Sequence, residues 1–94
     1  MHVGLLMVDC WIPESLSLKQ KRRVLQSTVE RLKRRHNIAI CEVEYQDQWQ
    51  RARLAIVTVN TERRMLESGL SQILTFLEQS RELEVIGSSS EQLR

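Results

Sequence analysis

The sequence predicts an α+β domain with its elements in the order strand, helix, strand, strand, helix, strand. Two stretches, 17–35 and 61–79, repeat apolar residues every three or four positions, which is the spacing of an amphipathic helix. Four shorter stretches are apolar and rich in β-branched residues, as strands are; these are 2–12, 38–45, 52–60 and 82–87. The 94 residues are expected to make one domain, 1–94.

Residues 2–12 are expected to form a central strand. Val3, Leu5 and Met7 alternate with further apolar side chains, so both faces of this strand are apolar. That pattern is typical of a strand that is covered on both sides. Pro13 ends the strand because proline has no backbone N–H to donate to a sheet.

The first helix, 17–35, begins with a capping signal. Ser17 and Gln20 match a capping box, in which the serine caps the first turn and the glutamine reaches back to it. The apolar stripe that faces the sheet is predicted to contain Leu18, Leu25, Val29 and Leu32, with Val24 and Thr28 beside them.

The second half of the chain repeats the pattern. Residues 38–45 and 52–60 are predicted strands, joined by a hairpin with no glycine or proline. Thr61 is the expected N-cap of the second helix. A short fourth strand follows at 82–87, and the chain over 86–94 is expected to be a loose C-terminal tail.

This order of elements is that of the ferredoxin-like βαββαβ sandwich. Right-handed crossovers place the first and third strands at the centre of a four-stranded antiparallel sheet, with two helices on one face. Cys10 and Cys41 then lie about 10 Å apart, on strands separated by the third strand, which is too far for a disulfide. Both are expected to be buried, reduced thiols.

The other face of the sheet is left open by this topology. It receives apolar side chains from the first strand, and a large exposed apolar patch usually marks an interface. The sequence therefore predicts a homodimer or higher homo-oligomer formed by sheet-to-sheet packing. The candidate interface residues are Leu5, Met7 and Trp11.

Basic residues gather in the first helix. The whole chain has a net charge of only +2, whereas residues 17–36 hold eight lysines and arginines against the single acid Glu30, a net charge of +7. Such a cluster points to an anionic partner. The alternative is an ordinary solvated helix face.

One rim of the predicted fold brings this helix close to aromatic side chains. The rim comprises residues 11–22 and 45–51, and it holds three of the four aromatic residues. A phosphate or a nucleic-acid backbone would fit there. The alternative is that the aromatic residues only plug the end of the core, with Arg51 paired to Asp47. The candidate nucleic-acid or anion-binding residues at and beside the rim are Lys19, Lys21, Arg22, Arg23, Trp49, Arg51 and Arg53.

Catalytic chemistry is not favoured by the sequence. The loop after the first strand has no glycine-rich phosphate cradle, and His2 and His36 stand alone. Asp9 is a single carboxylate where a metal site needs several donors. We therefore expect no catalytic residues, no metal and no cofactor, although the roles of Asp9 and Glu44 stay open. A small enzyme acting on a phosphorylated metabolite at the rim is the weakest alternative.

Three segments of the chain carry a family resemblance: GLL in the first strand, SLKQKRRVL at the start of the first helix, and QDQWQRARLAI across the hairpin. In these segments, and over about residues 2–80, the sequence resembles the YlxP-like family of small bacterial proteins, a domain of unknown function. The resemblance implies a ferredoxin-like fold and a cytoplasmic protein. Family genes often lie near genes for translation initiation and ribosome maturation, which implies a role around RNA or the ribosome. It implies no catalytic residues.

Two functions of different classes follow as hypotheses. The first is a non-enzymatic accessory protein that contacts RNA or a ribonucleoprotein through the basic helix and the Trp49 hairpin. Base stacking across the open sheet face is disfavoured, because the third strand has no aromatic residue. The second is a homo-oligomeric protein-interaction module that binds no nucleic acid. No apolar run is long enough to cross a membrane, and no signal peptide is recognisable, so a cytoplasmic location is expected.

Overall fold

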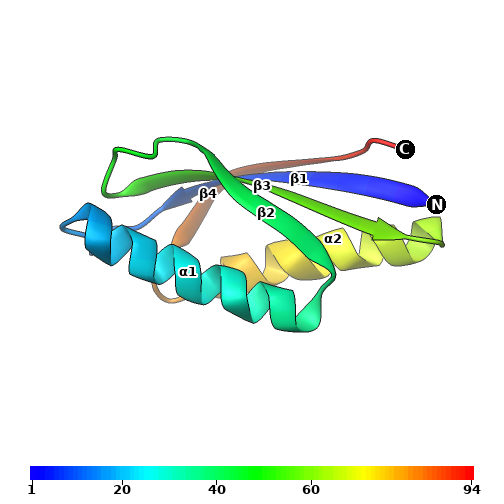
Figure 1. The fold of residues 1–94 in the computed structure, drawn as a ribbon, viewed down its shortest axis with the longest axis horizontal. Coiled ribbons are helices and arrows are strands. Elements are labelled where there is room, and N and C mark those ends of the chain that lie inside the picture. The colour runs from blue at the N-terminus through cyan, green and yellow to red at the C-terminus, as the bar shows by residue number, and fades with distance from the viewer.

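The computed structural model describes all residues, 1–94, and confirms the α+β prediction. One antiparallel sheet has the strand order β2-β3-β1-β4, and two helices accompany it (Figure 1). The elements are β1 (His2–Trp11), α1 (Leu18–Arg35), β2 (Ile38–Glu44), β3 (Arg51–Asn60), α2 (Arg63–Glu78) and β4 (Glu84–Gln92).

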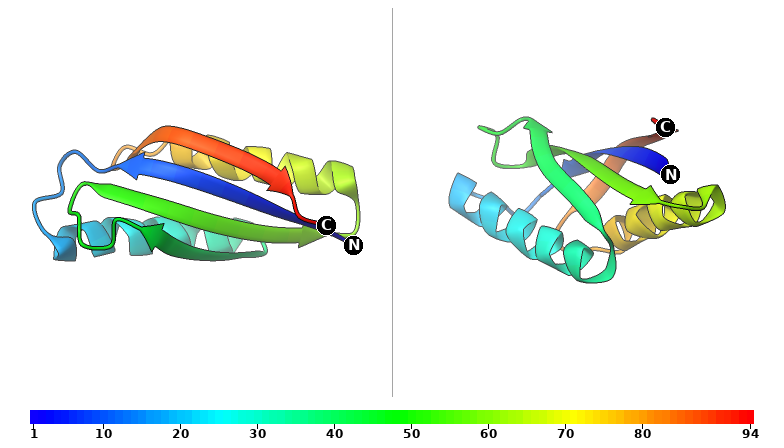
Figure 2. Two further views of the ribbon diagram at one scale, coloured as in Figure 1. Left: turned by 90° about the horizontal axis from the view of Figure 1, so that it is seen from above. Right: turned by 45° about the vertical axis from the view of Figure 1, so that its right-hand side comes forward.

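The molecule has two layers, with both helices beneath the same face of the sheet (Figure 2). Alternate residues of β1 point down into the core, so Leu6, Val8 and Cys10 are fully buried. Leu54 and Ile56 of β3 do the same next to them. The opposite face of the sheet has no covering layer, as expected from the topology.

Helix α1 begins as predicted but buries a different stripe. Ser17 Oγ accepts the N–H of Gln20 at 3.1 Å, while Gln20 Oε1 accepts the N–H of Leu16 at 2.6 Å, one residue before the expected position. Leu18 and Val29, which the spacing assigned to the core, are only half-buried. The buried residues are Lys21, Leu25, Thr28 and Leu32, so a lysine takes part in the inward face.

Helix α2 begins at Arg63, so its N-cap position is occupied by Glu62 and not by the predicted Thr61. Glu62 precedes its first turn without a side-chain cap, and Asn60 Oδ1 instead accepts the N–H of Glu62 at 3.0 Å. This helix passes so close to β1 that a Cβ on Gly4 would lie 2.8 Å from Cδ1 of Leu70. A glycine at this position therefore sets how closely α2 and the sheet can pack.

The expected loose tail is not observed. Strand β4 continues to Gln92 and pairs with β1, from Trp11 opposite Glu84 to Gly4 opposite Gln92. The prediction was wrong because three consecutive serines have low strand propensity, whereas the ladder supplied by the central strand decides the conformation.

Neither helix combines the length and the apolar character that a membrane crossing requires.

Candidate functional site

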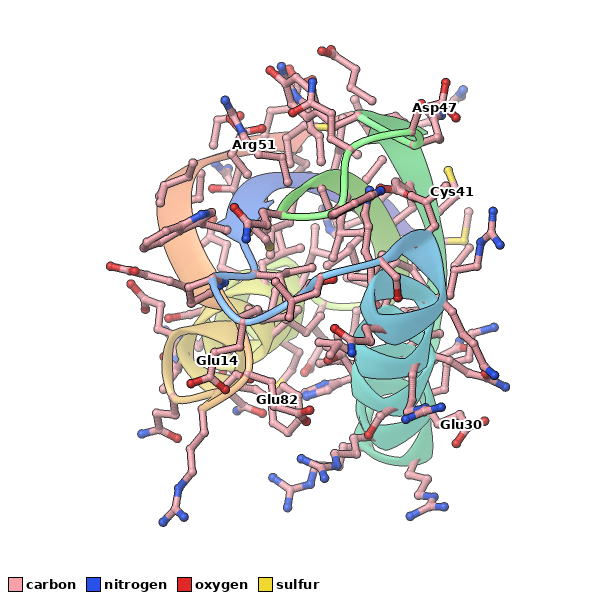
Figure 3. The ribbon with its side chains drawn as sticks, turned by 90° about the vertical axis from the view of Figure 1, so that its left-hand side faces the viewer. Glu14, Glu30, Cys41, Asp47, Arg51 and Glu82 are labelled. Atoms are coloured by element: carbon pink, nitrogen blue, oxygen red, sulfur yellow. The ribbon has the colours of Figure 1, made fainter.

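The rim predicted from the topology exists, and the hairpin between β2 and β3 is fastened to it. Gln50 Nε2 donates to the carbonyl oxygens of Pro13 at 3.1 Å and of Ser15 at 3.2 Å. The N–H of Ile12 donates to the carbonyl of Gln50 at 2.8 Å. Figure 3 looks directly onto this end of the molecule and shows Asp47 above the start of α1, with Arg51 further to the left, above the sheet. The hairpin and the beginning of the basic helix are therefore neighbours.

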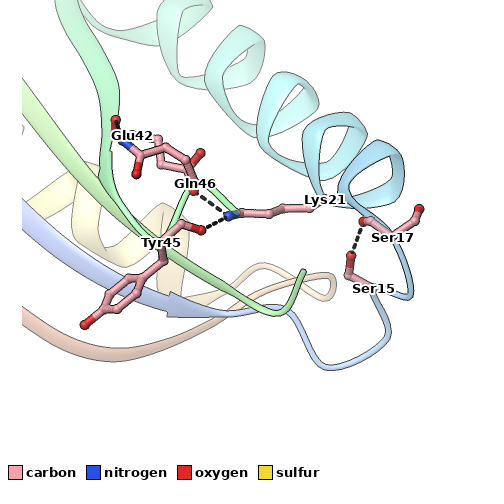
Figure 4. A network of polar contacts seen from close by, with 6 residues as sticks. All are labelled: Ser15, Ser17, Lys21, Glu42, Tyr45 and Gln46. Atoms are coloured by element: carbon pink, nitrogen blue, oxygen red, sulfur yellow. Dashed lines mark hydrogen bonds and ion pairs between the residues drawn. The ribbon is translucent and has the colours of Figure 1, made fainter. Parts of the chain in front are cut away.

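Lys21 is not available to an anion, which corrects the sequence-based assignment. Its side chain is 1% exposed, and Nζ donates to the carbonyl of Tyr45 at 2.6 Å (Figure 4). Nζ also lies 2.6 Å from Glu42 Oε2, an ion pair rather than a well-oriented hydrogen bond. Lys21 sits in the first turn of α1, and its long stem reaches under the sheet to hold the hairpin.

Tyr45 is the residue that turns the chain at the start of the hairpin. Its φ of 68° is the one positive value at a non-glycine residue in the chain. This left-handed conformation is uncommon for a bulky side chain. The Tyr45 carbonyl accepts both Lys21 Nζ and the N–H of Gln48 at 3.0 Å. These two donors compensate for the strain and explain how the hairpin dispenses with glycine.

The two arginines of the hairpin strand are engaged within the molecule. The Arg51 guanidinium carbon lies 4.3 Å above the centre of the Tyr45 ring, a cation–π contact, and forms no ion pair with Asp47. Arg53 lies between two carboxylates, 3.3 Å from Glu44 Oε1 and 3.8 Å from Asp9 Oδ1. Arg53 is therefore largely neutralised, which also gives Asp9 and Glu44 a structural partner.

Three basic candidates and Trp49 remain free. Lys19, Arg22 and Arg23 are exposed, and none of them lies within 4.0 Å of a carboxylate. The Trp49 side chain is 52% exposed and lines a shallow hollow with Leu16. Trp49 is consequently not a plug of the core, which was the alternative interpretation of this residue.

The rim also has an acidic side. Glu14 and Glu82 line one cavity of about 260 Å³ together with Arg23 (Figure 3). An approaching polyanion is repelled on this side and attracted on the side of α1. The loop after β1 is therefore electrostatically less favourable for a polyanion than the outer face of the helix.

The two cysteines differ in environment. Both are free thiols, as expected, but Cys41 is exposed on the open face of the sheet and not buried. Burial in the core, with a smaller contribution from the neighbouring Asp9, raises the pKa of Cys10 to about 12. Cys10 is thus protonated at neutral pH and is a core residue, not a nucleophile.

A groove between the two helices was not predicted. Two cavities of about 470 and 460 Å³ share Arg35, Phe76 and Gln79, so they are continuous along the helical side of the molecule. The i, i+4 spacing of Arg31 and Arg35 places both on one side of α1 and was the available sequence signal. That α2 faces them with uncharged residues could only be learnt from the packing.

Comparisons with known proteins match nearly the whole chain. A family model described as "Protein of unknown function (DUF503)" matches residues 3–90. The chain is also similar to the "Uncharacterized protein YlxP" of Bacillus subtilis (strain 168), with 35% identity over 82 residues. That match covers 87% of this chain and 89% of the Bacillus protein.

Proposed function

The chain belongs to the family described as proteins of unknown function (DUF503), and on that premise we propose a function from its own surface. It is a non-enzymatic accessory protein that contacts RNA or a ribonucleoprotein through the outer face of α1 and the Trp49 hairpin. With such a partner it works in the cytoplasm, in the translation or ribosome-maturation setting that the YlxP-like resemblance implies.

The observation that carries the proposal is an unneutralised basic helix. Seven of the eight cations in residues 17–36 are exposed, and none of the seven takes part in an ion pair. The surfaces of soluble proteins usually intersperse charges of both signs, so a helix that leaves seven cations unpaired favours a polyanion. These residues are Lys19, Arg22, Arg23, Arg31, Lys33, Arg34 and Arg35.

Trp49 adds a contact of a different kind. An exposed indole beside a basic helix can stack on an unpaired base, whereas phosphate contacts alone carry no such term. Trp49→Ala is expected to weaken RNA binding by about 5- to 150-fold, which corresponds to about 1–3 kcal/mol per stacked base. Its effect on stability is expected to be small because half of the side chain is already in water.

The test is a filter-binding titration of the full chain against ribosomal RNA over a range of salt concentrations. Removing two phosphate contacts in Arg22→Gln/Arg23→Gln is expected to weaken binding and to flatten the log–log salt slope by about 1.4–1.8. The matched control removes two charges at the opposite end of the helical layer, in Arg63→Gln/Arg64→Gln. Equal behaviour of the two double variants would contradict the proposal.

A second candidate function rests on the open sheet face. Leu5 and Met7 lie on this face opposite Val57 and Ala55, all four half-buried without a covering layer, and Trp11 is 39% exposed at the end of the row. This row favours a homo-oligomeric interaction module that binds no nucleic acid. Light scattering after size exclusion is expected to show a dimer or larger assembly, and Met7→Glu is expected to dissociate it. A wild-type monomer at high concentration would exclude this function.

A further inference from the structure

The groove between α1 and α2 has one basic wall and one uncharged polar wall. Arg31 and Arg35 project from α1, and Arg81 follows the end of α2. None of these three arginines has a carboxylate within 4.0 Å. The one carboxylate among the lining residues is Glu82, at the end nearest the rim.

The acidic residue of α1 does not neutralise this groove. Glu30 points to the side of α1 that is turned away from α2 (Figure 3). The facing surface of α2 carries Ser71, Gln72 and Thr75, which are exposed and uncharged. Short hydroxyl and amide side chains let a ligand approach closely, and they can both donate and accept hydrogen bonds.

Phe76 forms the apolar part of the groove and is packed against the core. The Arg35 guanidinium carbon lies 5.7 Å from the centre of its ring, so the aromatic face holds this cation in position. A single apolar residue is too little for an amphipathic helix or a lipid, which need a continuous apolar surface. The groove is built for a charged, hydrogen-bonding ligand.

The length of the groove suits a single-stranded polyanion rather than a small anion. Arg31 and Arg35 are one helical turn apart, or about 6 Å along the axis at ~1.5 Å per residue. The wall of α2 from Ser68 to Gln79 extends about 16 Å on the same measure. Arginines spaced along such a length can contact successive phosphates of one chain, each through the forked guanidinium.

We propose that the groove between α1 and α2 binds the sugar–phosphate backbone of single-stranded RNA, with Arg31, Arg35 and Arg81 on the phosphates and the Ser71–Thr75 surface on the ribose 2′-hydroxyls. This inference rests on the proposed function and deepens it, because it adds a second contact region on the basic helix. It favours RNA over DNA because the 2′-hydroxyl both donates and accepts hydrogen bonds, as the uncharged wall does.

Fluorescence anisotropy of the full chain with a labelled single-stranded RNA, and with DNA of the same sequence, tests the assignment. The triple variant Arg31→Gln/Arg35→Gln/Arg81→Gln is expected to bind RNA more weakly, with the salt slope flatter by about 2 at ~0.7 per phosphate contact. Gln72→Glu places a carboxylate in the groove and is expected to lower the affinity about fivefold or more.

The matched control is Gln92→Glu, which makes the same change at the exposed last residue of β4, outside both the groove and the basic helix. This variant is expected to change the affinity for RNA less than about twofold, because salt screens a charge that lies far from the bound RNA. Circular dichroism and urea unfolding confirm that each variant is folded, so lost binding is not lost structure.

The outcomes separate the two proposals. If the wild-type chain binds no RNA, the proposed function and the groove both fail. If Arg22→Gln/Arg23→Gln weakens binding while the triple variant and Gln72→Glu bind as the wild type does, the proposed function stands and the groove assignment is overturned. Equal affinity for DNA and RNA would overturn the role of the ribose hydroxyls.

Discussion

At the scale of single residues, Lys21 has the largest structural consequence. A lysine is almost never fully buried unless it is paired, and this one is paired with Glu42 and with the carbonyl of Tyr45. Both partners belong to the β2 side of the hairpin, so one side chain fixes the start of α1 to the turn that carries Trp49. The lysine thereby positions the proposed RNA contact without touching RNA.

Lys21→Met is expected to destabilise the fold by about 2–3 kcal/mol, because it removes a charged hydrogen-bond donor and leaves Glu42 without its partner. Urea unfolding measures the change. The exposed neighbour variant Arg22→Met is the control and is expected to stay within about 0.5 kcal/mol of the wild type. A loss for Lys21→Met no larger than that of the control would show that the buried contacts are not stabilising.

The thiols provide a second test at this scale. At pH 8 a thiol-specific reagent is expected to modify Cys41 in the folded protein and both cysteines in denaturant, because the raised pKa and burial of Cys10 suppress its thiolate. Mass spectrometry of the native reaction should show one added group. Two added groups at early times would mean that the core opens readily or that Cys10 is more accessible than described.

The same thiol predicts how stability changes with pH. The folded-state pKa of Cys10 is raised from 9.0 to about 12, so between these values the unfolded chain binds fewer protons than the folded one. The contribution of this thiol is therefore complete below pH 9 and is lost as the pH rises toward 12. Comparing urea midpoints of the wild type and Cys10→Ala at pH 8 and pH 10 is expected to show a steeper fall for the wild type.

At the scale of elements, α2 and β1 are held at a distance set by Gly4. Gly4→Ala is expected to destabilise the fold by about 1–2 kcal/mol, because the added Cβ meets Leu70 Cδ1 at 2.8 Å in a packed core. Gly69→Ala is the matched control: its Cβ meets nothing within 4 Å, and alanine favours the helix by about 0.5–1 kcal/mol. Thermal unfolding should move in opposite directions for the two variants.

The elements were predictable from the sequence because their signals are local. Apolar spacing identified all six, and the Ser17 capping signal located the start of α1. The burial of Lys21 was not predictable, since a basic residue in a first helical turn usually lies in water and its partners lie more than 20 residues further along the chain. The groove between α1 and α2 was not predictable for a similar reason, because its two walls come together only when the helices pack.

At the scale of the whole molecule, the end of β4 protects the sheet. Residues 88–92 cover the edge of β1 that would otherwise be open. Val3 continues the pairing, since its N–H donates to the carbonyl of Arg94 at 2.8 Å and its carbonyl accepts the N–H of Leu93 at 2.7 Å. The sequence predicted a loose tail instead, because the strand that pairs with residues 88–92 lies at the other end of the chain.

Truncation after Gly87 is therefore expected to lower stability markedly and to promote aggregation through the exposed edge of β1. Hydrogen exchange of the β1 amides between Val3 and Val8 reports the effect residue by residue. Removing Arg94 alone is the control and should leave most of this protection in place. Unchanged protection after the longer truncation would mean that β4 pairs too weakly to matter.

The pairing of Val3 with Arg94 also has a practical consequence. It brings the two ends of the chain together at one pole, while the hairpin and the start of α1 lie at the other pole of a molecule 42 Å long (Figure 1). A tether on either terminus would thus orient every immobilised copy with Trp49 toward the solution. A short peptide joining the termini would yield a circular permutant, and new ends would be tolerated best where the chain is not fastened by Lys21.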